Sequence, residues 1–185
     1  MSAIKLIPTS GGGSVSLAPP NSTSGSDVTI TMPSTSQTLG GSAGKILQVL
    51  QYVKSDTASV TSTSFTDTGL SQTITPSSIN SKILVLCDFF GSATNNAVLY
   101  LNLVRGSTNI SQGTGGGTDN QTKPLYSSGW MFSNAIHYLD SPSTTNATTY
   151  KIQWRVNGNS ATMNGWYGNS DYGATSSLTL MEVGA

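Results

Sequence analysis

Charged side chains are scarce in this sequence. Only 9% of its 185 residues are Asp, Glu, Lys or Arg, against about 25% in an average soluble domain. The eight basic residues are scattered from Lys5 to Arg155, and the net charge is zero. Binding to nucleic acid or to an anionic membrane surface depends on clustered Lys and Arg. The sequence therefore argues against both kinds of partner.

The residues that most often carry chemistry are equally rare. Cys87, His137 and Glu182 are the single cysteine, histidine and glutamate of the chain. One cysteine cannot form an intramolecular disulfide, which fits assembly in a reducing cytoplasm. A zinc site needs more His or Cys ligands than these, and an acid/base carboxylate pair would have to come from scattered Asp residues. We expect no metal, no cofactor and no enzymatic activity.

Long apolar runs are also missing. The N-terminal stretch MSAIKLIPTS lacks the apolar core of a signal peptide. The longest apolar run, ILVLC at 83–87, is far too short to span a bilayer. We therefore expect no membrane insertion.

Hydroxyl-bearing and β-branched residues are abundant instead. Ser and Thr number 55, and 14 aromatic residues together with many Val and Ile provide material for a core. No window shows the helical period, whereas apolar alternation and turn residues recur along the chain. The pattern predicts an all-β protein, an antiparallel β-sandwich of the jelly-roll type. The expected strands span 46–53, 65–75, 82–90, 97–105, 134–140, 149–156 and 176–183.

The first part of the chain differs from the rest. Residues 11–33, GGGSVSLAPPNSTSGSDVTITMP, hold two short alternating fragments that end in proline and align at a spacing of 13. Isolated strand pairs are not stable alone, so we expect them to be ordered by other subunits or by a larger particle. We divide the chain into an extended β/loop arm, residues 1–44, and a sandwich head domain, residues 45–185.

Two motifs resemble catalytic signatures. GGSAG at 40–44 matches the nucleophile elbow, which needs a strand before the serine and a helix after it. A loop precedes this segment and a strand-like segment follows, which favours a flexible junction. His137 and Asp140 lie three residues apart on an expected strand, so they should point to opposite faces. We expect His137 to be a partly buried structural residue.

The aromatic residues fall into two groups. Tyr150 and Trp154 share the apolar face of an alternating strand and are expected in the core. The second group lies in stretches rich in Gly, Ser and Asn: Trp130, Trp166, Tyr167 and Tyr172. Such residues could stack on sugars or be buried between subunits or at the end of the sandwich. Burial is favoured, because exposed aromatic clusters are uncommon on soluble chains.

Several segments occur in an order that resembles a known module. They are a GK-hydrophobic-Q strand at 44–54, a Ser/Thr-rich segment ending in TGL at 60–70, ITPSS…SKILV at 74–85, LVRGST at 103–108, LDSP…TTYKIQ at 139–153 and LMEV at 180–183. In these features the body is similar to a recurrent module of tailed-bacteriophage virion proteins, found in marine and cyanobacterial phages. The N-terminal segment is similar to stretches that precede tail-fibre modules.

The resemblance implies a virion structural protein, assembled in the host cytoplasm and displayed on the virion surface. It implies a homotrimeric fibre or tail appendage, anchored to other virion proteins through residues 1–44. In that role, loops at 112–130 and 157–174 would contact a host-surface glycan. The alternative is a protein that decorates the capsid, and a third reading is a polysaccharide-cleaving enzyme. No catalytic residue is carried over from the family.

Overall fold

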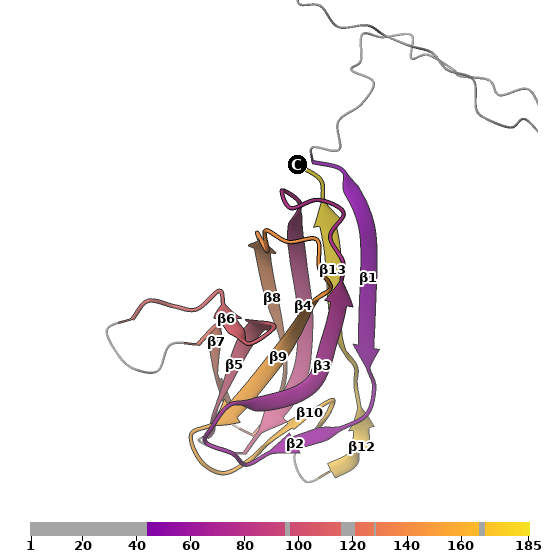
Figure 1. Cartoon of the computed structure of the whole chain (residues 1–185). Coiled ribbons are helices and arrows are strands. Elements are labelled where there is room, and N and C mark those ends of the chain that lie inside the picture. The colour runs from indigo at the N-terminus through magenta and orange to yellow at the C-terminus, as the bar shows by residue number, and fades with distance from the viewer. Residues whose placement is uncertain (1–43, 95–96, 116–120, 128, 167–168) are drawn as a thin grey trace, which may run out of the picture. The chain divides into compact units, whose positions relative to one another are not determined.

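The structure is a computed structural model of the chain (Figure 1). It describes residues 44–94, 97–115, 121–127, 129–166 and 169–185, with the backbone alone for Ser127 and Asn169–Tyr172. These residues all belong to one compact unit, Gly40–Ala185. The described part contains no helix, and hence none that could cross a membrane. The predicted arm lies outside the described residues except for Gly44, so its boundary stays a prediction.

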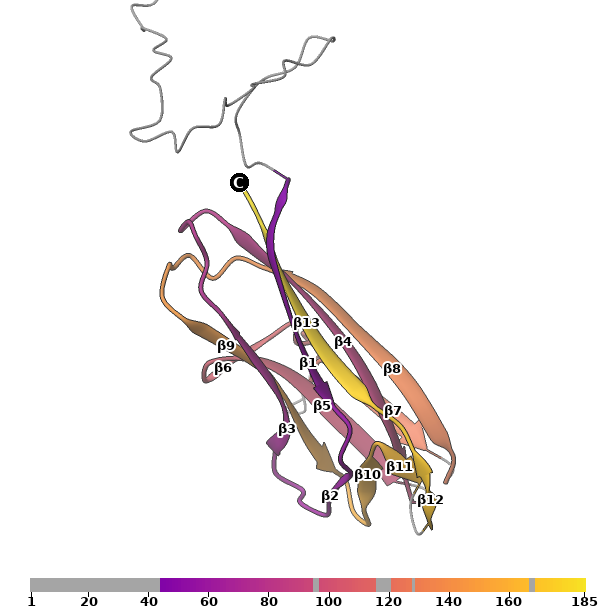
Figure 2. The same cartoon turned by 90° about the vertical axis from the view of Figure 1, so that its right-hand side faces the viewer.

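The prediction of an all-β sandwich is confirmed: two antiparallel sheets pack against each other (Figure 2). The first sheet contains β1 (Ile46–Lys54), β2 (Ala58–Val60), β4 (Lys82–Ala93), β8 (Met131–Asp140), β10 (Ala161–Met163) and β13 (Ser176–Val183). The second sheet contains β3 (Thr66–Ile74), β5 (Ala97–Arg105), β6 (Thr108–Ile110), β7 (Lys123–Ser127) and β9 (Thr148–Val156). A small hairpin of β11 (Gly165–Trp166) and β12 (Asn169–Gly173) completes the described strands.

The main strands pair in a nested order. Strand β1 pairs with β13, β3 with β9, β4 with β8, and β5 with β7. The chain thus behaves as one long hairpin whose successive pairs alternate between the first and second sheets. This pairing brings Gly44 beside the C-terminal end, where its amide donates to the Gly184 carbonyl oxygen at 2.7 Å.

Alternation along the strands builds the core. In β9 the predicted inward face, Tyr150, Ile152, Trp154 and Val156, is buried, and the polar residues between them face outward. Removing each such side chain from water stabilises the fold by roughly 1.5–3 kcal/mol. Across the core, the ring of Phe89 packs edge-on against Trp154, with centroids 6.2 Å apart.

Strands with a clear period were predicted closely, and short ones were missed. Strands β5 and β13 have the predicted bounds, and β4 and β8 extend by three residues beyond them. The sequence pattern did not reveal β2, β7, β10, β11 and β12, which have two to five residues each. So short a segment contains too few alternations to be recognised.

The segment NGNS at 157–160 contains two Asn and a Gly, a composition that predicts a hairpin turn. That prediction is wrong in its connectivity. Strand β9, which precedes the segment, lies in the second sheet, and β10, which follows, pairs with β4 and β2 in the first. The segment therefore crosses between the sheets. Its residues do adopt positive φ as expected, with 147° at Gly158 and 62° at Asn159, because glycine and asparagine tolerate that conformation.

Candidate functional site

Two of the four singled-out aromatic residues meet in space. The rings of Trp130 and Trp166 stack with centroids 6.1 Å apart and planes inclined by 10°. Trp130 is 70% exposed, and Trp166 is half-buried beneath it. We call this arrangement the tryptophan pair. The exposed area of the tryptophan pair belongs mainly to Trp130, against whose ring Trp166 stacks.

Trp166 is held by its polar atom as well as by its ring. Its Nε1 donates a hydrogen bond to the backbone carbonyl of Gly129 at 2.8 Å. Gly129 has φ of 88°, a conformation that glycine adopts without steric cost, and directly precedes Trp130. The bond therefore ties Trp166 to the segment that carries Trp130, so the two rings are fixed relative to each other.

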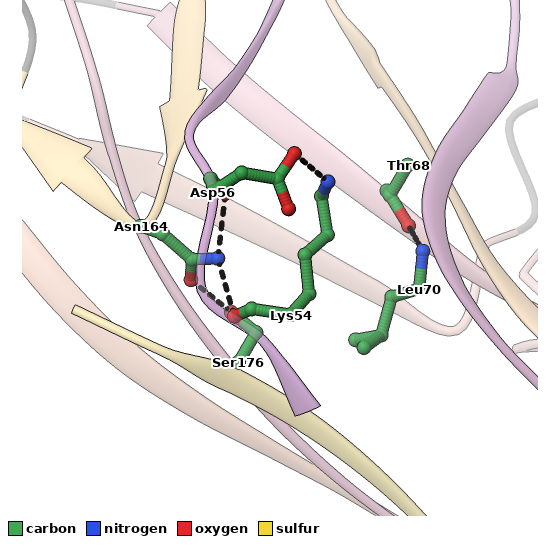
Figure 3. A network of polar contacts seen from close by, with 6 residues as sticks. All are labelled: Lys54, Asp56, Thr68, Leu70, Asn164 and Ser176. Atoms are coloured by element: carbon green, nitrogen blue, oxygen red, sulfur yellow. Dashed lines mark hydrogen bonds and ion pairs between the residues drawn. The ribbon is translucent and has the colours of Figure 1, made fainter. Parts of the chain in front are cut away.

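Asn164 anchors the start of the hairpin that contains Trp166 (Figure 3). This fully buried residue donates from Nδ2 to the carbonyl oxygens of Lys54 at 2.8 Å and Asp56 at 3.0 Å. Its Oδ1 accepts from the Ser176 hydroxyl at 2.7 Å. Its backbone is in the left-handed region with φ of 57°, where asparagine is one of the few tolerated residues.

The backbone of Asn164 closes the same hairpin. The Ala174 amide donates to the Asn164 carbonyl at 3.1 Å, and the Asn164 amide donates to the Phe90 carbonyl at 2.9 Å. Residues 164 and 174 bracket β11 and β12, so the side chain and backbone of Asn164 together fix both ends of the hairpin on the sandwich. Sequence reasoning missed Asn164, because nothing in NGWYGNSDYG distinguishes a buried asparagine from an exposed one.

The site lies at one end of the sandwich. Strands β10, β11 and β12 occupy the end opposite to the C-terminus and the start of β1 (Figure 2). Trp130 lies in the connection between β7 and β8. Tyr126, which is two-thirds exposed, lies shortly before it in β7. The segments that contain the tryptophan pair thus lie at the end of the head domain that is farthest from Gly44.

The structure describes little of the two remaining predicted aromatic residues. Tyr167 lies outside the described residues, and Tyr172 has a described backbone in β12 but no described side chain. The two predicted loops need correction, since 112–130 includes β7 and 157–174 includes β10, β11 and β12. The favoured burial of Trp130 at the sandwich end is also wrong for the single chain, because most of its surface is exposed.

The two residues considered for catalysis, His137 and Asp140, do not form a catalytic pair. His137 is exposed, so the expectation of a partly buried histidine is wrong, and Asp140 lies on the opposite, buried face of β8. The Asp140 carboxylate accepts from Arg105 Nη1 at 2.9 and 2.8 Å and from the Tyr150 hydroxyl at 2.6 Å. Burial, and next this hydrogen bond, raise the pKa of Tyr150. These contacts give Asp140 a structural role.

Other chemistry finds little support in the described part. The glycine of the GGSAG motif that is described, Gly44, is followed by β1 instead of the helix that a nucleophile elbow requires. Within the described ranges, no three His, Cys, Asp or Glu residues lie close enough to hold a metal ion. No model of a known protein family matches the chain, and no curated protein matches it.

Proposed function

We propose that this chain is a structural protein of a tailed-bacteriophage virion that binds a host-surface glycan with the tryptophan pair. The family resemblance of segments from 44–54 to 180–183 supports the virion role. The observation that carries glycan binding is the stacking of Trp130 on Trp166 with the outer ring largely exposed. An exposed indole face attracts the apolar C–H face of a sugar and needs no net charge, which suits this nearly uncharged chain.

The nested strand order supports the finer description of the fold. Eight strands in two sheets, paired first with last, correspond to the double Greek key of a jelly roll. We interpret the sandwich as a jelly roll in which the chain enters at one end and the tryptophan pair lies at the other. This polarity suits a displayed head domain.

In this proposal three copies form a fibre or tail appendage on the virion surface. Residues 1–44 anchor the trimer to other virion proteins, and the end with β11 and β12 faces outward. Capsid decoration is the alternative, with the same fold and the same anchoring arm but a different position and copy number. The chain acts by binding, without a metal or cofactor and without catalysis.

Cell binding by purified protein tests the glycan-binding role. Trp130→Ala should weaken binding of fluorescently labelled protein to host cells by roughly tenfold, since an aromatic contact contributes about 0.5–1.5 kcal/mol beyond its buried area. Trp130→Phe should keep part of the binding because it keeps an aromatic face. The thermal midpoint should be unchanged in both variants, because Trp130 is mostly exposed.

Ile79→Ala is the matched control. Ile79 is also a large exposed apolar residue, but it lies in the turn between β3 and β4. Its loss should leave cell binding intact. Equal binding by wild type and Trp130→Ala, or an equal loss in Ile79→Ala, would show that the tryptophan pair is not the recognition surface.

A further inference from the structure

An apolar row crosses the outer face of the first sheet. Val49 of β1 lies directly opposite Met181 of β13, which lies opposite Leu84 of β4, which lies opposite Leu139 of β8. The two outer members, Val49 and Leu139, are 53% and 48% exposed. We call these four residues the apolar row. Rows of exposed apolar residues on a sheet face mark interaction surfaces more often than ordinary solvent-facing surface.

The second sheet shows what an ordinary solvent face looks like in this protein. There Lys151 Nζ and Gln153 Nε2 donate to the Asp67 carboxylate at 2.9 and 2.8 Å. The hydroxyls of Thr73 and Thr149 are 2.8 Å apart across the strands. Over β3 and β9, the outer face is thus covered by polar side chains that bond to one another.

The outer face of the first sheet also has such pairs, since Gln51 Nε2 donates to Thr179 Oγ1 at 2.8 Å and Ser133 Oγ donates to Asp88 Oδ1 at 2.7 Å. The apolar row interrupts this polar pattern, because in it four apolar side chains stand side by side across four strands.

The edge of the first sheet extends this surface. Among the described strands, β1 is an edge strand of the first sheet and pairs only with β13. Leu47 and Val53 are exposed along with Val49. Between Ile46 and Val53 the strand has no proline and no charge, the residues with which proteins usually protect a solvent-exposed edge. A partner is therefore expected along β1 as well as over the apolar row.

The charges beside the row identify the partner. Lys82 and Asp88 are both exposed on β4, on the same outer face, with Leu84 and Leu86 between them. They lie about 20 Å apart along the strand, so they cannot pair within one chain. Neighbouring copies that turn this face toward a shared axis offer one another an apolar surface for the row, an anion for Lys82 and a cation for Asp88.

We propose that the outer face of the first sheet is the surface through which copies of this chain pack against one another. Apolar contact across the row supplies the burial, and pairing of Lys82 with Asp88 of a neighbour sets the register. The surface lies on the side of the sandwich, so the end that bears the tryptophan pair lies outside it. This inference rests on the self-association that is part of the proposed function.

Charge introduction tests the row. Wild-type protein should show a mass above that of the monomer in light scattering at micromolar concentration. Val49→Glu/Leu139→Glu should give the monomer mass with an unchanged circular dichroism spectrum. The control Ser71→Glu/Asn146→Glu adds the same charge at two exposed polar positions away from the row and should keep the wild-type mass.

Charge exchange tests whether the partner is a second copy. Lys82→Asp alone and Asp88→Lys alone should each raise the dissociation constant about tenfold, because each brings like charges together across the interface. The double variant Lys82→Asp/Asp88→Lys should restore association. Only an interface in which the two positions meet between copies predicts this restoration.

Several outcomes would overturn the inference. If wild type is monomeric and Val49→Glu/Leu139→Glu is less stable than wild type, a segment of the same chain covers the row. An oligomer that survives the row variants would place the interface elsewhere. A row-dependent dimer would support this surface and contradict the trimer. Host-cell binding of wild-type protein, measured separately, decides the glycan-binding proposal independently of these results.

Discussion

Asn164 shows how one buried polar residue can determine the geometry of an exposed site. Its amide bonds to two carbonyls and one hydroxyl, and its backbone holds both ends of the hairpin that carries Trp166. Removing such a side chain leaves buried polar partners without hydrogen bonds, which costs more than the bonds themselves contribute. The orientation of the tryptophan pair therefore depends on Asn164, although none of the hydrogen bonds described for Asn164 is to either ring.

Asn164→Ala should lower the free energy of unfolding by about 3 kcal/mol. The carbonyls of Lys54 and Asp56 lose the Asn164 amide, and the Ser176 hydroxyl keeps only its contacts with Phe90. Alanine is also strained in the left-handed backbone. The substitution should also weaken the near-ultraviolet circular dichroism that arises from the tryptophan pair.

Asn159→Ala is the matched control, because Asn159 has a similar φ of 62° but is exposed. It should cost only about 1 kcal/mol, for the left-handed backbone. Urea unfolding measures both, and equal losses would contradict this account of Asn164.

Strands with a long alternating or apolar run could be predicted from the sequence. Features that depend on tertiary contacts could not. The alternation of β9 and the unbroken apolar run of β4 identified core strands and, through them, the fold class. The composition around Trp130 and Trp166 identified both as candidates. Their stacking could not be predicted, since they are 36 positions apart in sequence and meet only because Asn164 turns the chain beside β4.

Glu182 joins three elements at the edge of the first sheet. From β13, its carboxylate accepts from Gln48 Nε2 of β1 at 2.6 Å and from the Ser77 amide and hydroxyl, in the turn after β3, at 2.7 and 2.6 Å. The residue is fully buried. Burial alone would raise its pKa, but the hydrogen bonds outweigh burial and lower the pKa from 4.5 to about 2.

This depressed pKa predicts a pH-dependent contribution to stability. The ionised carboxylate stabilises the fold above the unfolded pKa of 4.5, and the stabilisation is lost as pH falls toward about 2. The amount is up to about 3 kcal/mol, at 1.36 kcal/mol per pKa unit. Glu182→Gln should be less stable than wild type in urea unfolding at about pH 6, and the difference should shrink at about pH 2.5. A difference that is independent of pH would contradict the ionised network.

At the scale of the whole molecule, we propose different roles for the two ends of the head domain. The described part of the head domain begins at Gly44, beside the C-terminal end, and β11, which contains Trp166, lies with β12 at the far end (Figure 2). The side between them bears the apolar row. Our proposals thus place attachment, association and recognition on three separate surfaces, so we expect that each can be altered without changing the others.

Cryo-electron microscopy of virions that carry this protein tests the central claim most directly. The account predicts clustered copies of the head domain projecting from the particle, with the Gly44 end toward the virion and the β11–β12 hairpin outermost. A position on the tail would support the appendage, and a regular array on the head would support capsid decoration. Head domains with the tryptophan pair buried against the particle, or no copies on the virion, would contradict the account.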